Sequence, residues 1–178
     1  MPKHQKKILS VKIRHMIDGD PDASYLGKYT DKSQDNAIIC VGEHRGRFVS
    51  DLSDDEILPD KCGRTTYCFF VPAMTGEQTG NPNSPIEDFE RMAALNNGDW
   101  YYIGIRAEAE VGISTNGKEW KLDRLISRGL WGIESDSEES FFKEVESDEL
   151  NDLRETLSAY GFTKKQIKEA FQNVGQKE

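Results

Sequence analysis

The sequence predicts a single α+β domain over residues 1–178, in which an antiparallel sheet with a central Asn-Gly hairpin is packed by about three helices. Two patterns indicate this fold. Apolar and polar residues alternate at 100–113 and at 120–126, which is typical of half-buried strands, and other segments carry apolar residues at helical spacing. With 36% hydrophobic residues, the chain has enough apolar surface to form a core, which excludes disorder of the whole chain.

The Asn-Gly dipeptide at 116–117 joins the two alternating segments. This dipeptide favours a two-residue turn whose twist matches that of the flanking strands. With that turn, Val111 is expected to pair with Leu122, so that apolar side chains meet on one face. Arg124 opposite Ala109 is the exception, and the small alanine leaves room for the arginine stem.

Further strands are expected outside the hairpin. Alternation over 9–17 predicts a strand with its basic residues on the outer face, and the polar segment 18–36 is expected to be turn-rich. Shorter strands are expected at 38–41, 47–49 and 64–71. These strands would extend the sheet around the hairpin.

Helices are expected over 85–96, 136–160 and 164–174, the last within a C-terminal helical segment at 162–178. The segment 72–85 contains three of the six prolines and is expected to be an exposed loop. The first two helices follow sequences typical of a capping box, namely Ser84 with Glu87 and Ser135 with Glu138, and residues 163–166 are expected to start the last helix.

The charge of the chain is negative and concentrated in one segment. The net charge is −9, which argues against a general binder of nucleic acid or anionic membranes. Residues 134–155 contain ten acids against Lys143 and Arg154. On a helix, four of these acids fall on one arc away from the apolar face: Glu144, Asp148, Asp152 and Glu155. They are predicted to bind a basic protein partner, and the alternative is a solvated face that aids solubility.

Two other acids of the same segment, Glu146 and Glu149, lie nearer the apolar arc. They are expected to pair with a lysine or arginine of a neighbouring element, because a carboxylate close to a core needs a partner. These two acids are therefore expected to have a structural role.

Cysteine usage and the N-terminal residues indicate a cytoplasmic protein. Cys40, Cys62 and Cys68 are odd in number and contain no C-x-x-C pair, so reduced thiols are expected. The basic N-terminal segment lacks the apolar region of a signal peptide, and no stretch approaches the apolar length of a membrane span.

No cofactor and no metal ion is expected. The segment 112–118 has the glycine and lysine spacing of a phosphate-binding loop, but Glu119 follows where serine or threonine is needed, and the segment lies in a hairpin. His4, His15 and His44 are not spaced as metal ligands on a helix.

The outer face of the hairpin provides the strongest candidate for catalysis. Two carboxylates and a lysine are the outline of a metal-dependent nuclease, in which the acids hold a divalent cation. The alternative is cross-strand charge pairing, which the pattern favours. The residues concerned are Arg106, Glu108 and Glu110 on one strand, with Glu119, Lys121 and Asp123 on the other.

Trp131 lies between Gly129 and Gly132, just before the predicted acidic helix. Glycines beside a large ring favour a close approach of the backbone, so the indole is expected in the core under the helix start. The alternative is an exposed tryptophan that recognises a partner.

Three segments carry a resemblance to a known group of proteins: Asn97-Gly98-Asp99-Trp100, Ile103-Gly104-Ile105-Arg106-Ala107 and Gly129-Leu130-Trp131-Gly132-Ile133-Glu134-Ser135-Asp136-Ser137. Over about residues 86–161, the chain resembles hypothetical proteins carried by bacteriophages and mobile elements. The resemblance implies an accessory gene of a phage or prophage that acts in a bacterial cytoplasm.

These observations predict a non-enzymatic phage or prophage accessory protein, which binds a host protein through its acidic helical face. A basic nucleic-acid-binding protein fits that face, and inhibition of a host defence is the expected effect. No direct contact with nucleic acid or membrane is expected, and a metal-dependent nuclease-like enzyme is the alternative function.

Overall fold

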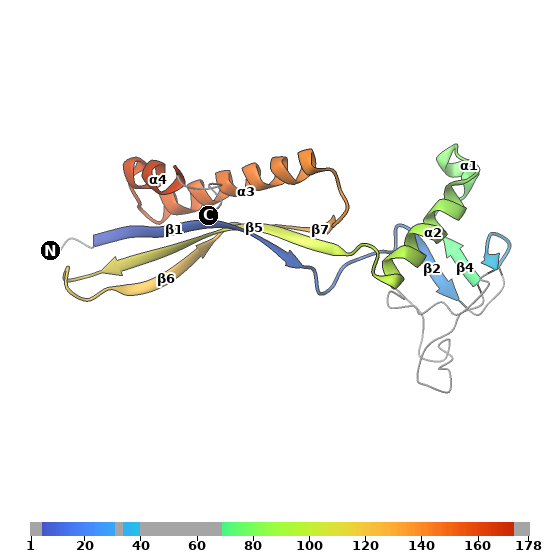
Figure 1. Ribbon diagram of the computed structural model, residues 1–178, viewed down its shortest axis with the longest axis horizontal. Coiled ribbons are helices and arrows are strands. Elements are labelled where there is room, and N and C mark those ends of the chain that lie inside the picture. Colours follow the sequence, from blue (N-terminus) through green and yellow to red (C-terminus); the bar gives the residue numbers. More distant parts are fainter. Residues whose placement is uncertain (1–4, 31–33, 40–68, 173–178) are drawn as a thin grey trace, which may run out of the picture. The chain divides into compact units, whose positions relative to one another are not determined.

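The computed structural model describes residues 5–30, 34–39 and 69–172, and it confirms an α+β fold with antiparallel sheets (Figure 1). The chain divides into two compact units. One consists of Met1–Gly19 and Tyr102–Glu178, and the other of Asp20–Tyr101. The prediction of a single domain over residues 1–178 did not anticipate this division.

The first unit contains a four-stranded antiparallel sheet with β5 (Tyr102–Ser114) at its centre. The predicted N-terminal strand is present as β1 (Gln5–Ile17) and pairs along one edge of β5. β6 (Lys121–Ile126) and β7 (Leu130–Glu134) pair in succession along the other edge. The sequence patterns did not predict β7, which is five residues long and contains Gly132.

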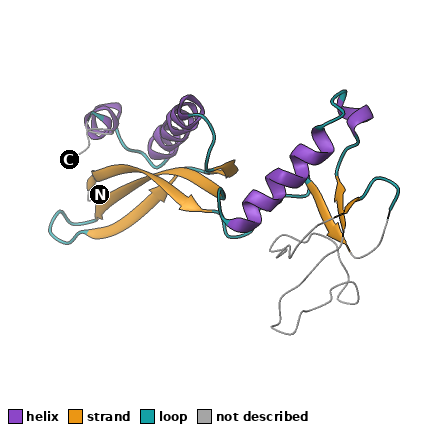
Figure 2. Ribbon diagram, turned by 45° about the vertical axis from the view of Figure 1, so that its right-hand side comes forward, coloured by secondary structure: helices purple, strands orange, loops and turns teal. Residues whose placement is uncertain are grey.

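Two helices, α3 (Glu139–Ala159) and α4 (Lys164–Phe171), cover one face of this sheet (Figure 2). The buried alanines of β5 let the leucines of α3 pack close to the strand. No helix among the described residues of this unit covers the other face, which we call the open face. The buried cluster on the covered face consists of Ala107, Ala109, Val111, Leu125, Leu153, Leu157, Phe162 and Ile167.

The predicted register of the hairpin is wrong by one residue. Val111 pairs with Asp123 and Ala109 with Leu125, whereas Val111 was expected to pair with Leu122. Because side chains alternate between the faces of a strand, this shift exchanges the faces of every residue in β6. Leu125 is therefore buried in the core, and Leu122 is on the open face with 69% of its surface exposed.

The cause of the shift is the loop between the strands. The Asn116 side chain accepts hydrogen bonds from the backbone N–H groups of Lys118 and Glu119, both at 2.9 Å. Ser114 Oγ accepts another from the N–H of Gly117 at 2.8 Å. These bonds stabilise a longer loop than the expected two-residue turn, because side-chain acceptors compete with the hairpin ladder.

The helix starts differ from two of the three predictions. Asn83 precedes α2 (Ser84–Asn97) and Glu138 precedes α3, and neither forms a side-chain cap. The last helix begins where it was expected, and Thr163 and Gln166 exchange hydrogen bonds as a capping box at the start of α4. α4 ends at Phe171, and residues 173–178 of the predicted C-terminal helix lie outside the described residues.

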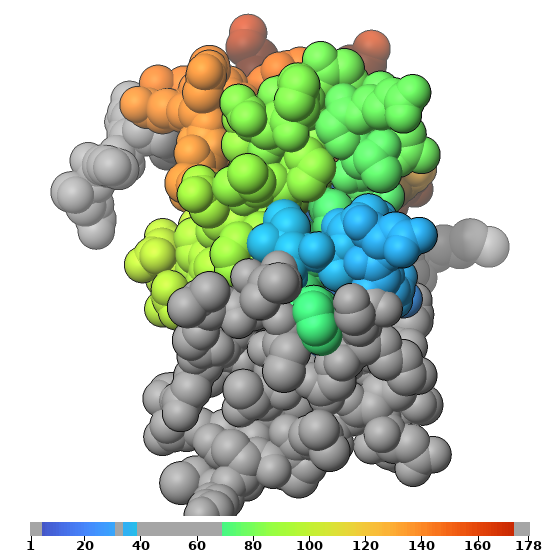
Figure 3. Space-filling model, turned by 90° about the vertical axis from the view of Figure 1, so that its right-hand side faces the viewer, coloured from blue at the N-terminus to red at the C-terminus, as the bar shows by residue number. Residues whose placement is uncertain are grey.

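The second unit contains a small antiparallel sheet in the order β2-β4-β3, together with two helices. In Figure 3, described residues of 20–39 (blue) adjoin those of 69–98 (green) at the surface of this unit. Three aromatic rings pack together inside it, with the ring centres of Tyr29 and Phe70 5.2 Å apart and those of Phe70 and Phe89 5.5 Å apart. The strands are β2 (Gly27–Thr30), β3 (Ile38–Ile39) and β4 (Phe69–Pro72), and α1 (Gly76–Thr79) precedes α2.

Two elements of this unit correct the sequence analysis. β2 lies in the segment 18–36 that was expected to be turn-rich, and α1 lies within 72–85, which was expected to be a loop. A capping box between Thr75 and Gln78 stabilises α1. The strand predicted at 47–49 lies outside the described residues.

The register can be tested with two leucines of β6. We expect Leu125→Ala to lower the free energy of unfolding by about 2–4 kcal/mol, because a buried side chain is lost. The matched change Leu122→Ala is expected to cost less than about 0.5 kcal/mol, because that side chain is exposed. Urea denaturation followed by circular dichroism measures both, and the reverse order of the two losses would contradict the observed register.

Candidate functional site

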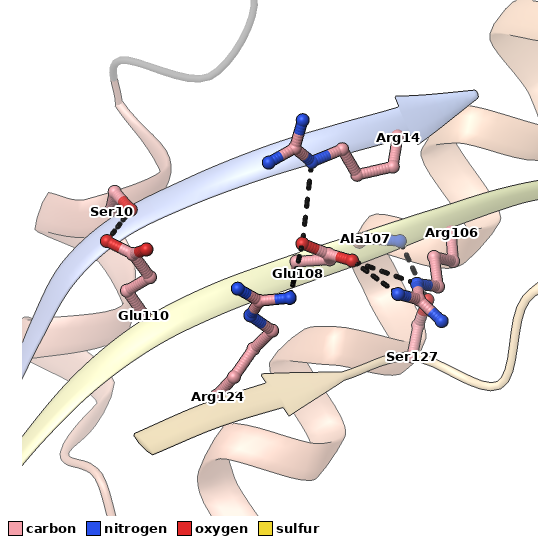
Figure 4. Close-up of polar contacts among 8 residues, drawn as sticks. All are labelled: Ser10, Arg14, Arg106, Ala107, Glu108, Glu110, Arg124 and Ser127. Atoms are coloured by element: carbon pink, nitrogen blue, oxygen red, sulfur yellow. Dashed lines mark hydrogen bonds and ion pairs between the residues drawn. The ribbon is translucent and has the colours of Figure 1, made fainter. Parts of the chain in front are cut away.

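The open face of the sheet carries a band of charged side chains from three strands. Residues that lie directly opposite each other in paired strands project from the same face. The observed pairs are Lys12 with Glu108, Arg14 with Arg106, and Arg124 with Glu110. Ser10 Oγ also donates to Glu110 Oε2 at 3.3 Å (Figure 4).

Glu108 is the centre of this band. It is only 7% exposed, and three arginines surround its carboxylate (Figure 4). Arg106 Nη2 lies 2.6 Å from Oε1, Arg14 Nε lies 3.5 Å from Oε2, and Arg124 Nη1 lies 3.9 Å from Oε2. Three guanidinium groups share one carboxylate, so the cluster has a net charge of +2.

The environment of Glu108 keeps it ionised. Burial raises the pKa of Glu108, whereas the hydrogen bond from Arg106 and the charges of Arg106, Arg124 and Arg14 lower it. The arginines outweigh burial, so the pKa lies below its ordinary value. Glu108 therefore serves as a fixed anion that positions guanidinium groups, and it is unsuited to proton transfer near neutral pH.

The structure does not bring together the six residues of the catalytic hypothesis. Arg106, Glu108 and Glu110 share the open face, but Lys121 and Asp123 pair with residues of the covered face. Glu119 lies in the loop before β6. In the described part of the chain, no three His, Cys, Asp or Glu side chains are grouped so as to hold a metal ion. The face shows the cross-strand pairing that the sequence favoured.

Trp131 is at one end of the open face, and the expectation of a core position is wrong. It is 44% exposed, and its ring lies over Gly104, where an added methyl group would be 2.2 Å from Cε3. The pairing of β7 with β5 shifts between Ile103 and Ile105, which turns the indole to the open face. Gly104 of β5 accommodates the ring together with Gly129, where an added methyl group would lie 3.1 Å from Nε1 of the indole.

Trp120 has a similar position at the opposite end. A methyl group at Gly112 would lie 3.1 Å from its Cε3, and the Lys7 ammonium lies 4.2 Å from the ring centre. Trp120 remains 36% exposed. Each end of the open face thus carries a partly exposed indole over a glycine of β5.

The predicted carboxylates of α3 divide into two groups. Glu144, Asp148 and Glu155 are exposed, and their carboxylates form no ion pair or hydrogen bond with any described residue. We call these three the acidic row. Asp152 is partly buried, and its Oδ2 accepts a hydrogen bond from the N–H of Arg128 at 2.8 Å. Three of the four predicted residues are therefore available to a partner.

Two further acids of α3 have partners that the sequence did not reveal. Glu149 is 9% exposed and accepts a hydrogen bond from the N–H of Gly129 at 2.9 Å. Glu146 Oε1 lies 2.8 Å from His15 Nε2. The expected lysine or arginine partners are thus replaced by a backbone group and a histidine. The one sequence signal for the first contact was Gly129, a residue that often marks a strand end with unpaired N–H groups.

Comparison with models of protein families, with curated proteins and with solved structures found no match. Among the described helices, none combines the length and apolar character needed to cross a membrane. Inferences about function therefore depend on the geometry of the chain's own residues.

The Glu108 cluster predicts a pH dependence of stability. Folding lowers the pKa of Glu108. Its contribution to the free energy of unfolding is therefore present above the unfolded pKa of about 4.3 and is lost as the pH falls through the folded pKa. Glu108→Gln is expected to lower the free energy of unfolding at pH 7 by about 1–3 kcal/mol and to flatten its fall below about pH 4.3. Urea denaturation at a series of pH values measures both effects.

The control is Glu119→Gln, which removes an exposed carboxylate from the loop before β6. It is expected to leave the pH dependence of stability close to that of the unaltered protein. An equal fall at acid pH in Glu108→Gln and the unaltered protein would contradict the role assigned to the arginine cluster.

Proposed function

We propose that this chain is a non-enzymatic accessory protein of a phage or prophage that binds a basic host protein through the acidic row of α3. The observation that carries the proposal is the division among the acids of this helix. Glu149 and Asp152 form hydrogen bonds that attach α3 to the sheet of the same unit. The three carboxylates of the acidic row are exposed. A fixed helix presents its remaining carboxylates in a constant geometry.

The acidic row suits a basic surface. Glu144 and Asp148 are four residues apart, so they are neighbours on the helix, and the row extends for about 16 Å to Glu155. Like charges at this spacing cost roughly 0.2–0.5 kcal/mol per pair, a repulsion that a cationic partner relieves. Such complementarity raises both the rate and the specificity of association.

The setting follows from the resemblance of residues 129–137 to proteins of phages and mobile elements. In a phage-infected cell, the partner is a basic nucleic-acid-binding protein in the bacterial cytoplasm. Occupying its cationic surface would keep it from nucleic acid, because the same cations neutralise phosphates. Counter-defence inhibition is the role that we assign to this contact.

The proposal is tested by neutralising the acidic row with Glu144→Gln, Asp148→Asn and Glu155→Gln. The altered chain is expected to lose capture of a basic protein from nuclease-treated bacterial lysate. With the captured protein purified, Kd is expected to rise about ten- to a hundredfold, because three charge pairs are removed. Thermal stability is expected to stay unchanged or to rise slightly, since the repulsion is relieved.

The matched control is Glu77→Gln, Glu90→Gln and Glu119→Gln, which removes the same charge at exposed positions outside α3. It is expected to leave capture intact. Capture of the same proteins in the same amounts by the unaltered chain and by the acidic-row variant would remove the basis of the proposal.

A further inference from the structure

We propose that the open face of the four-stranded sheet binds single-stranded DNA. The juxtaposition that carries this inference is a band of cations between two partly exposed indoles, on the side of the sheet away from α3 and α4. The inference goes beyond the proposed function, which concerns α3 alone. It also departs from the expectation of no direct nucleic-acid contact, because that expectation came from the charge of the whole chain.

The charge of the open face is opposite to that of the chain. The chain has a net charge of −9, but between Gly104 and Gly112 the strand register places five cations and two acids on this face. A third acid, Glu134, lies opposite Tyr102, beyond Gly104. One of the acids, Glu108, is buried beneath three arginines, so an approaching anion meets mainly the guanidinium groups. The cations are Lys7, Lys12, Arg14, Arg106 and Arg124, and the acids are Glu108 and Glu110.

The indoles provide stacking surfaces for bases. Trp131 lies over Gly104 and is 44% exposed, and Trp120 lies over Gly112 and is 36% exposed. Stacking on an aromatic ring favours any unpaired base, whereas the bases of a duplex already stack on one another. The two glycines are eight residues apart in β5, about 26 Å at the rise of a strand, which suits a run of several nucleotides.

The surface between the indoles favours DNA over RNA. Leu9, Leu122 and Ile126 are 45%, 69% and 44% exposed. Leu9 and Leu122 line a shallow depression together with Glu110, Asp123 and Arg124. Apolar side chains accommodate deoxyribose and the thymine methyl group. A ribose 2′-hydroxyl would lose water there without gaining a hydrogen bond.

The test uses the full chain and fluorescein-labelled oligothymidylate about 12 nucleotides long, with binding followed by fluorescence polarisation. Affinity is expected to fall with salt, with a slope of about −2 to −3 for three to four neutralised phosphates. Trp120→Ala and Trp131→Ala are each expected to raise Kd about 5- to 100-fold. Unlabelled DNA is expected to quench the intrinsic fluorescence of the unaltered chain, since Trp100 is buried and the other two tryptophans are accessible.

Controls separate this face from the rest of the molecule. Lys12→Gln with Arg14→Gln is expected to weaken binding and to make the salt slope shallower by about 1 to 1.5. Lys164→Gln with Lys165→Gln removes the same charge from α4 and is expected to change Kd less than about twofold. Phe141→Ala, which removes an exposed ring from α3, is expected to have no effect. The acidic-row variant should bind DNA at least as tightly, so this inference and the proposed function fail separately.

Three results would overturn the inference: no salt-sensitive binding, both tryptophan variants binding like the unaltered chain, or duplex DNA or single-stranded RNA of the same length binding as tightly as oligothymidylate. If circular dichroism shows that Trp131→Ala does not fold, Trp131→Leu replaces it. Leucine keeps apolar contact with Gly104 but removes the aromatic face. Together with Trp120→Ala it decides the role of the indoles.

Discussion

Two carboxylates of α3 attach this helix to the sheet of the first unit, at the connection between β6 and β7. β6 and β7 line the same edge of β5, so the chain must leave the ladder between them, and the N–H groups there lose their strand partners. Asp152 and Glu149 accept hydrogen bonds from Arg128 and Gly129. The contact also satisfies the partly buried carboxylates, which would otherwise be costly to remove from water. It sets how α3 lies on the sheet, and hence which of its acids face outward.

The charge of the first unit is divided between two faces. The outward side of α3 keeps exposed carboxylates, while the opposite side of the sheet gathers lysines and arginines. The net charge of −9 hides the second surface, because a sum over the chain contains no information on direction. Within the cationic face, Glu108 holds three guanidiniums and neutralises only one, so the excess must be balanced by solvent ions or by an anionic ligand.

The sequence by itself determined the elements whose patterns are local. Alternation identified β1, β5 and β6, and apolar residues at helical spacing identified α2, α3 and α4, because such patterns report which side of one segment is buried. The exposure of Glu144, Asp148 and Glu155 followed from the same reasoning. The capping box of Thr163 and Gln166 was also predictable, since both residues belong to one turn.

Only the tertiary structure decided how these elements face one another. The hairpin register depends on the side chain of Asn116, which bonds to the loop backbone, and a slip of one residue moved Leu122 out of the core and Arg124 beside Glu108. The position of Trp131 depends on Gly104, a residue of another strand, as well as on its sequence neighbour Gly129. The partner of Glu149 is a backbone group at a strand break that no local pattern predicted. In each case the outcome depends on a contact between segments, whereas a periodic pattern describes one segment alone.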